Sequence, residues 1–263
     1  MGVLNVTPDS FSDGGRHLDP AAALASARRM VAAGAAIIDV GGESTRPGAV
    51  APALEEELAR VVPVVRALAA ELGVVISVDT SRPAVIEAAV AAGADLINDV
   101  RALADPAALA ACARLGVGVC VMHMQGTPAT MQNAPAYGDV VVEVREFLAA
   151  RVAACRAAGI PADAIAVDPG FGFGKTTTHN LALLARLREF TTLGCPLLVG
   201  LSRKSLAGAL TGRKAGERLA GSVALAALAV RAGADIVRAH DVAETVDAVA
   251  IGAALRDAEQ GEA

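Results

Sequence analysis

The sequence predicts an α/β protein with a single domain, a (β/α)8 TIM barrel that spans residues 1–263. Three features lead to this fold class: eight short apolar runs recur along the chain, alanine-rich amphipathic segments separate them, and no linker or shift in composition divides the series. Short apolar runs between helices are typical of buried parallel strands. Eight such units in roughly 250 residues are typical of a closed barrel. A doubly wound open sheet is the alternative, which the regular succession of units disfavours.

The predicted strands and helices alternate from one end of the chain to the other. The strands lie near Val3–Val6, Ile37–Val40, Val74–Val78, Leu96–Asn98, Val119–Met122, Ile165–Val167, Leu197–Gly200 and Ile236–Arg238. Segments such as Pro20–Ala33 and Val140–Ala158 are predicted as intervening helices. Asp19 suits an N-cap, because Pro20 then takes the first helical position. Pro63 lies inside the second helical pattern, where a proline is expected to kink or split the helix.

The composition excludes several classes of function. The 263 residues are 54% hydrophobic, which is enough for a large core. A net charge of −5, 2% aromatic residues and no tryptophan argue against a nucleic-acid partner. The most apolar helical stretch, from Leu219, is too short to span a bilayer, and the first residues do not resemble a signal peptide. The four cysteines form no C-x-x-C pair, which predicts reduced core residues and a cytoplasmic location.

Polar or charged residues follow all eight predicted strands. In a barrel of this class the carboxyl ends of the strands carry the active site. The residues are Asn5, Asp39 with Glu43, Asp79, Asn98 with Asp99, His123, Asp168, Ser202 with Lys204, and Arg238 with His240. Any one of them could simply cap the next helix, but eight together predict a functional site. Asp79, Asn98 and Asp168 suit the edge of a flat heterocycle, since a carboxylate accepts two bonds from adjacent N–H donors.

Other residues at the strand ends suit an anion. Asn5, Arg238 and His240 can bind negative charge, and Lys204 can serve either group. A basic mouth on a net-acidic protein predicts an anionic small substrate. Lys204 as a Schiff-base lysine is an alternative. The sequence contains no H-E-x-x-H, no zinc-type spacing among its four histidines, and no G-x-S-x-G.

The stretch "DPGFGFGK", Asp168 to Lys175, has the composition of a phosphate-binding loop but not the spacing. A Walker loop needs a glycine where Pro169 stands, and the dinucleotide fingerprint needs one at Lys175 or Thr177. No phosphate role is therefore predicted. From the residues alone the stretch is either a flexible turn or a binding loop that carries Asp168 and two phenylalanines.

With these motifs at its strand ends, the chain resembles the bacterial dihydropteroate synthases nearly from end to end. The segments that carry the resemblance are "MGVLNVTPDSFSDGG" at Met1, "DVGGESTRPG" at Asp39, "SVDTSRPAV" at Ser77, "INDV" at Ile97, "MHMQGTPATMQ" at Met122, "DPGFGFGK" at Asp168, "GLSRKS" at Gly200 and "VRAHD" at Val237. The resemblance implies a transferase of folate biosynthesis and a sulfonamide target. Its reaction joins 7,8-dihydropterin-6-ylmethyl diphosphate to p-aminobenzoate and releases diphosphate.

The resemblance also implies a role for each site residue. A pterin pocket is implied for Asp79, Asn98, Asp168 and Lys204, a diphosphate site for Asn5, Arg238 and His240, and a p-aminobenzoate site for Phe11, Thr45, Arg46, Pro47, Phe173 and Ser202. Met122 and Gly200 are implied substrate-binding residues without a named substrate. Asp79, Asp168, Lys204 and Arg238 are the implied catalytic residues. Mg²⁺ on Asn5 is the implied metal, and a homodimer is the implied assembly. "DPGFGFGK" then becomes a loop for the pterin and the arene.

We expect a dissociative reaction, because departure of diphosphate leaves a cation that the dihydropterin ring delocalises. Two other functions fit less well. A pterin-dependent methyltransferase domain would share the acidic pterin site but would not need "NVTPDSFSDGG" or "ESTRPG". A catalytically inactive scaffold would not need charged residues at all the strand ends.

Overall fold

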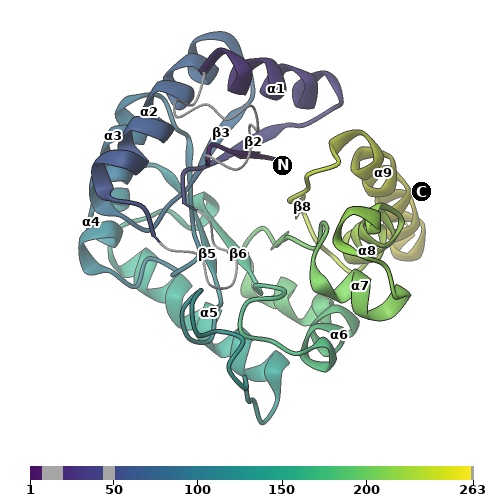
Figure 1. The fold of residues 1–263 in the computed structure, drawn as a ribbon. Coiled ribbons are helices and arrows are strands. Elements are labelled where there is room, and N and C mark those ends of the chain that lie inside the picture. Colours follow the sequence, from purple (N-terminus) through teal and green to yellow (C-terminus); the bar gives the residue numbers. More distant parts are fainter. Residues whose placement is uncertain (8–19, 44–50, 262–263) are drawn as a thin grey trace.

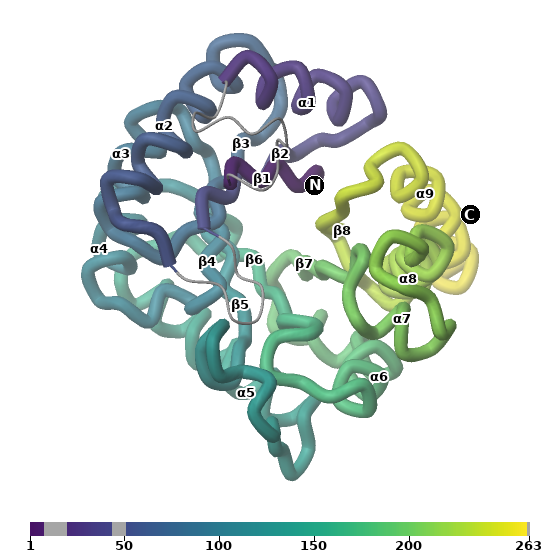
Figure 2. The backbone as a smooth tube through the Cα atoms, in the orientation of Figure 1, coloured from purple at the N-terminus to yellow at the C-terminus, as the bar shows by residue number. Residues whose placement is uncertain are grey.

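The computed structural model describes residues 1–7, 20–43 and 51–261, which form a (β/α)8 barrel (Figure 1). The strands are β1 (Gly2–Asn5), β2 (Ile37–Gly41), β3 (Val75–Asp79), β4 (Leu96–Asp99), β5 (Gly118–Met122), β6 (Ile165–Asp168), β7 (Leu198–Val199) and β8 (Ile236–Val237). The α-helices are α1 (Pro20–Ala32), α2 (Leu54–Glu71), α3 (Pro83–Ala91), α4 (Pro106–Leu115), α5 (Val140–Ala157), α6 (Thr177–Ala185), α7 (Ser205–Thr211), α8 (Leu219–Arg231) and α9 (Val242–Gln260). The tube in Figure 2 shows the strands at the centre and the helices around them.

The eight strands close into one barrel. Strands β1 to β6 pair in parallel in the order of the chain, and β7 pairs with β8. Two isolated bridges join these sheets, Val167 to Leu197 on one side and Gly2 to Ala239 on the other. All eight predicted strands are therefore confirmed, and the alternative of an open sheet is wrong.

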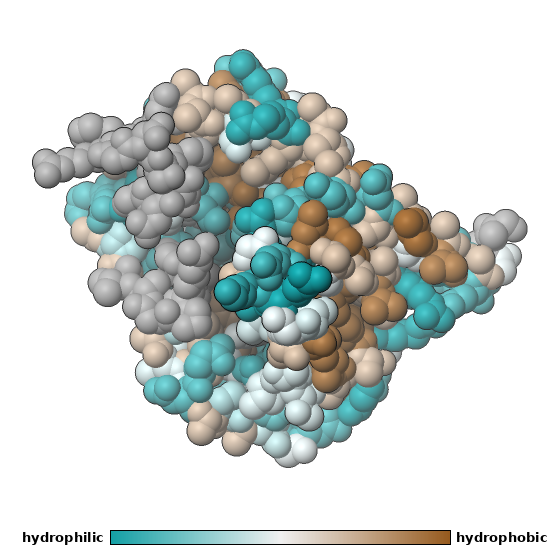
Figure 3. All heavy atoms as spheres, turned by 45° about the vertical axis from the view of Figure 1, so that its right-hand side comes forward, coloured by the Kyte–Doolittle hydropathy of each residue, from teal (hydrophilic) through white to brown (hydrophobic). Residues whose placement is uncertain are grey.

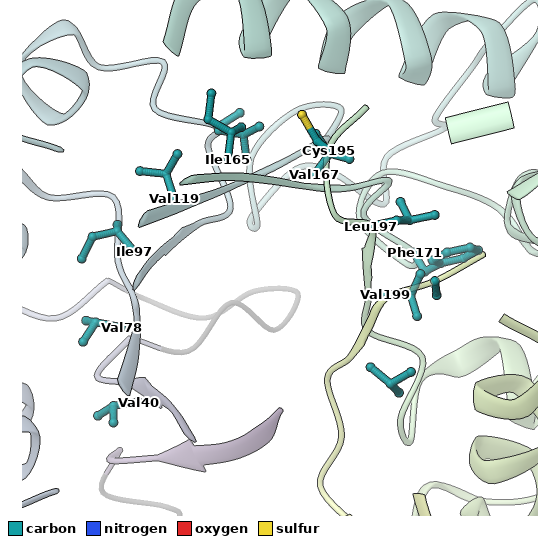
Figure 4. Close-up of a cluster of buried hydrophobic side chains, with 14 of the residues drawn as sticks. Val40, Val78, Ile97, Val119, Ile165, Val167, Phe171, Cys195, Leu197 and Val199 are labelled. Atoms are coloured by element: carbon teal, nitrogen blue, oxygen red, sulfur yellow. The ribbon is translucent and has the colours of Figure 1, made fainter. Parts of the chain in front are cut away.

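Side chains alternate between the two faces of the strands. Outward-facing apolar residues such as Val40, Val78 and Ile97 point away from the barrel axis, towards the helices (Figure 4). A smaller buried cluster of Cys120, Ala166 and Leu198 belongs to the other face of its strands. The main core therefore lies between the strands and the helices, as expected for this fold.

Of the two effects expected of Pro63, a kink or a split of its helix, the split is wrong. Helix α2 continues through Pro63 from Leu54 to Glu71. A proline within a helix costs about 3 kcal/mol through its lost hydrogen bond and its ring clash. The same helix buries Val61, Val64, Val65 and Leu68, and burying one such side chain fully contributes about 1.5–3 kcal/mol. Packing on the strands thus outweighs the local cost. The predicted cap Asp19 lies outside the described residues.

The surface over α8 and α9 is unusually apolar. The two helices pack side by side, and Gly252 permits it, because a Cβ there would lie 2.5 Å from the Ala227 carbonyl oxygen. Beside this contact Leu228, Ile251 and Leu255 are each at least half exposed. Figure 3 shows brown side chains gathered on this side of the molecule. None of the described helices is long and apolar enough to cross a membrane.

Candidate active site

The register of the first four strands places four site positions in one row. Asn5 pairs with Gly41, Gly41 with Asp79, and Asp79 with Asn98. A Cβ added to Gly41 would lie 3.6 Å from Asn5 Oδ1 and 3.7 Å from Asp79 Cβ, so glycine brings the two polar side chains close together. Asp79 and Asn98 are 8% and 5% exposed. The row forms one wall of the candidate site, a group of polar side chains at the carboxyl ends of the strands that we call the polar pocket.

Asp39 lies one pleat below this row and is fully buried. Its Oδ1 accepts a hydrogen bond from Ser77 at 2.6 Å, and its Oδ2 accepts one from the Asn98 amide at 3.3 Å. Arg238 reaches across from β8 and donates from Nε to Asp39 at 2.6 Å and from Nη2 to Asp79 at 3.2 Å. A guanidinium that donates to two carboxyl groups makes strong, charge-assisted hydrogen bonds. The site therefore contains a preorganised Asp39–Arg238–Asp79 triad.

Burial sets the charge state of this pocket. It raises the pKa of Asp79 to about 7, an effect that Arg238 opposes and that Asp39 adds to. Burial lowers the pKa of Lys204 to about 8, although Asp168 opposes the shift. Burial also lowers the pKa of Arg238, but Asp39 and Asp79 outweigh it and the net shift is upward. Groups that titrate close to neutral pH are characteristic of sites that bind or transform charged ligands.

The opposite wall is the β6–α6 loop, residues 169–176. Asp168 ends β6, beside Met122 of β5 in the register, and its Oδ1 accepts a hydrogen bond from Gly170 N at 2.7 Å. Gly170, Gly172 and Gly174 all have positive φ angles, which glycine adopts without strain. A Cβ on Gly170 would lie 1.9 Å from the His123 carbonyl oxygen, so no other residue fits there.

Lys204 connects this loop to the mouth of the barrel. Its Nζ donates to the Phe171 carbonyl at 2.6 Å and lies 4.6 Å from the centroid of the Phe173 ring. Gly200 lies beneath it, because a Cβ there would be 3.5 Å from Nζ. Asp168 and Lys204 lie close enough for their charges to interact, with Phe173 as an apolar neighbour of the lysine.

Ser202 and His240 form a third part of the site. The Ser202 hydroxyl lies 3.1 Å from His240 Nδ1 and accepts a hydrogen bond from the His240 backbone N–H at 3.1 Å. Burial and then Arg238 lower the pKa of His240 to about 4. The His240 side chain is therefore neutral at pH 7 in the free protein. Arg238, which stays charged, supplies the positive charge that attracts an incoming anion.

The remaining predicted residues, Phe11, Thr45, Arg46 and Pro47, lie outside the described residues. Asp39 was predicted only as one of the polar strand-end residues, with no specific role, although the outward-facing Ile38 and Val40 on either side of it indicate that it points into the barrel. No role was predicted for Lys175, which is 3% exposed. No spacing rule predicts which way that side chain turns.

The described residues include no cluster of three or more histidine, cysteine or acidic side chains that could hold a metal ion. Mg²⁺ does not require one, since it often takes one or two protein ligands and completes its shell with water and substrate phosphates. The amide oxygen of Asn5, at the edge of a pocket with Arg238 and His240, fits such a ligand.

An α/β barrel with acidic and amide groups facing a lysine and an arginine at its strand ends defines an enzyme-type site for a small, polar, flat ligand. The family model of pterin binding enzymes matches residues 1–240. The chain belongs to this family, and within it to the dihydropteroate synthases.

Known dihydropteroate synthases are similar along the whole chain. The protein from Escherichia coli is 53% identical over 262 residues, which cover 100% of this chain and 93% of that one. The structure of the Xanthomonas albilineans enzyme with 4-aminobenzoic acid is 52% identical, with a TM-score of 0.91 over 97% of this chain and 92% of that one. The structure of the same enzyme in complex with 7,8-dihydropteroate is 49% identical, with a TM-score of 0.88 over 97% and 92%.

Proposed function

We propose that this chain condenses 7,8-dihydropterin-6-ylmethyl diphosphate with p-aminobenzoate to give 7,8-dihydropteroate and diphosphate. The single observation that carries the proposal is the juxtaposition of Asp79 and Asn98 on one wall with Asp168 and Lys204 on the other. These are the acceptors and donors that a pterin edge requires, in a chain whose relatives bind p-aminobenzoate and dihydropteroate.

The pterin is held at the buried end of the site. Asp168 keeps one oxygen on the Gly170 N–H and presents the other to the N–H donors of the ring. Asn98 is oriented by Asp39 through its amide. Arg238, fixed by Asp39 and Asp79, offers a planar guanidinium against which a flat ring can stack, which a lysine could not.

The reaction breaks the bond between the pterin methylene carbon and the diphosphate oxygen and forms a bond from that carbon to the amine nitrogen of p-aminobenzoate, which loses one proton. We favour dissociation before attack. The buried carboxyl groups of Asp79 and Asp168 stabilise positive charge on the ring, because electrostatic stabilisation is strong among fixed, buried groups. A neutral aromatic amine needs no strong base to attack such a cation.

The leaving diphosphate lies towards the mouth, beside Arg238 and His240, with Asn5 as a ligand of Mg²⁺. Bound Mg²⁺ would supply Lewis-acid neutralisation of the phosphate charge. Phe173 and Ser202 border the place left for p-aminobenzoate, and Phe11, Thr45, Arg46 and Pro47 complete it in this proposal.

The experiment that tests the function is an assay of the purified chain. It is supplied with the dihydropterin diphosphate, p-aminobenzoate and Mg²⁺, and dihydropteroate and diphosphate are quantified by chromatography. We expect equal amounts of the two products. Methyl transfer to or from a methyl-pterin without diphosphate release would instead identify a pterin-dependent methyltransferase, and no reaction would identify a binding protein.

We further propose a cytoplasmic homodimer. The four cysteines are free and buried, which suits a reducing compartment. The apolar surface formed by Leu228, Ile251 and Leu255 suits a second copy of the chain, since patches of this kind are usually covered by a partner.

A further inference from the structure

The β6–α6 loop is held by side chains at every carbonyl from Gly170 to Gly174. Lys175 Nζ donates to the carbonyls of Gly170 and Phe173, each at 2.9 Å, and Lys204 Nζ donates to that of Phe171. Gln132 donates to Gly172 O at 2.8 Å, and the Tyr137 hydroxyl donates to Gly174 O at 2.7 Å. Two of the three side chains from outside the loop come from the β5–α5 segment. The loop is therefore an ordered turn held by side-chain hydrogen bonds, and the interpretation of it as a flexible turn is wrong.

Lys175 is the most buried of the donors. At 3% exposure its ammonium has three acceptors at 2.9 Å, namely His123 Nδ1 and the carbonyls of Gly170 and Phe173, and a longer contact of 3.3 Å with His123 O. An ammonium carries three protons, so the donors match the near acceptors one for one. None of these acceptors is a carboxylate. Burial lowers the pKa of Lys175 to about 7, although the negative charge of Asp168 opposes the shift, so the side chain carries its full set of three protons below neutral pH.

His123 fits this arrangement as a neutral acceptor. Burial and then Lys175 lower the pKa of His123 to about 3, so that its ring is uncharged. With Nδ1 accepting from Lys175, the ring proton is assigned to Nε2. The ring itself is fixed by an edge contact with Phe147 at 4.9 Å. The ammonium is thus bound to a rigid part of the barrel as well as to the loop.

The bonds of Lys175 bracket the residues that face the site. Gly170 and Phe173 are the two ends of the turn that contains Phe171. The Phe171 carbonyl accepts a hydrogen bond from Lys204, and the Lys204 ammonium also lies over the Phe173 ring. We propose that Lys175 is a positioning residue, whose ammonium fixes this turn so that Phe173 and Lys204 meet the substrates in one geometry. The proposal rests on the proposed function, in which Phe173 borders p-aminobenzoate and Lys204 binds the pterin.

The test replaces Lys175 with methionine, which has a similar length and no donor, and uses Lys214→Met on the exposed surface as its control. Loss of a hydrogen bond to a charged group costs enough to raise the KM for p-aminobenzoate by about tenfold or more. We expect a smaller rise in the KM for the pterin substrate, since Lys175 contacts the Phe173 backbone directly, whereas Lys204 keeps its hydrogen bond to the Phe171 carbonyl. Lys214→Met should leave both constants unchanged.

A double-mutant cycle with Phe173→Ala asks whether Lys175 acts through Phe173. If it does, Lys175→Met adds little in the Phe173→Ala background, because residues that act together are not additive. Effects that multiply fully in the double variant would overturn the proposal, and so would an unchanged KM in the single variant. Lys175→Gln keeps an amide donor and should give the same change at smaller size.

A spectroscopic measurement separates this proposal from the proposed function. The chain has three lysines, Lys175, Lys204 and Lys214, so ¹³Cε-labelled lysine gives three signals. The signal of Lys204 is shifted by the Phe173 ring in the wild type and should move towards that of Lys214 in Lys175→Met at pH 6. An unmoved signal contradicts the positioning role even if the wild type proves inactive. If neither substitution yields folded protein, Lys175 serves global stability and the proposal is wrong.

Discussion

The residues of the site hold one another in place before any substrate binds. Arg238 lies between Asp39 and Asp79, and Asp39 also orients Asn98. Asp39 is therefore a supporting residue at the base of the pocket, although its own carboxylate is fully buried. Such support matters because catalysis depends on donors and acceptors that need no rearrangement when the substrate arrives.

Replacing Asp168 with asparagine should weaken pterin binding at least about tenfold, because a hydrogen bond to a charged group contributes about 1.5–3 kcal/mol. The asparagine oxygen would remain on the Gly170 N–H, which turns the amide donor towards the N–H edge of the pterin. Calorimetry with a phosphate-free pterin measures the loss, and exposed Asp163→Asn is the control. Equal affinity in the wild type and the Asp168 variant would remove Asp168 from the pterin site.

His240 should take up a proton when diphosphate binds. Its pKa of about 4 in the free protein rises when negative charge arrives, so affinity increases as the pH falls through the range between the free and bound pKa values. Calorimetry at pH 6 with Mg²⁺, in two buffers of different ionisation heat, measures the uptake. The wild type should take up more protons than His240→Gln, by up to about one. Identical uptake in both proteins would show that the anion does not face His240.

Among the elements, the strands were predictable and the loops were not. The recurrence of short apolar runs between helices indicates all eight strands, and the register of the strands then places Asn5, Asp79 and Asn98 together. The course of the β6–α6 loop depends on Gln132 and Tyr137, which are about forty residues away in sequence. Helix α2 likewise continues through Pro63 because of tertiary packing, which local rules do not include.

The β6–α6 loop should tolerate no side chain at Gly170. Gly170→Ala places Cβ 1.9 Å from the His123 carbonyl oxygen, so the loop must move. A displacement of about 1 Å costs about a hundredfold in activity. Gly194→Ala is the matched control, because Gly194 has φ +67° and nothing within 4 Å of the added Cβ. Both variants incur similar backbone strain, and kcat/KM should fall only in the first. A normal kcat/KM for Gly170→Ala would contradict the structure of the loop.

For the molecule as a whole, the fold class could be predicted because the eight units are regular. The surface used for assembly could not be predicted from the sequence alone. The pattern of α8 and α9 indicates apolar helices, but only the packed structure separates their core residues from the exposed Leu228, Ile251 and Leu255. Burial, and not hydrophobicity alone, therefore defines the surface that we assign to a second copy.

Sedimentation at micromolar concentration should show a species of twice the 26.3 kDa chain mass. Leu228→Glu and Leu255→Glu place charges in the apolar surface and should give monomers, because burying an unpaired charge is costly. Val75→Glu, at an exposed position on β3, is the control and should remain dimeric. A monomeric wild type would show that the surface serves another purpose.

The most direct test of the central claim, that the polar pocket at the strand ends is where the pterin is bound and alkylated, is a crystal structure of the chain with 7,8-dihydropteroate. We predict that the pterin ring lies between Asp79 and Asn98 on one side and Asp168 and Lys204 on the other, that Arg238 lies against its face, and that the aminobenzoate extends past Phe173. A product molecule bound elsewhere, with this pocket still closed by its own ion pairs, would contradict the account.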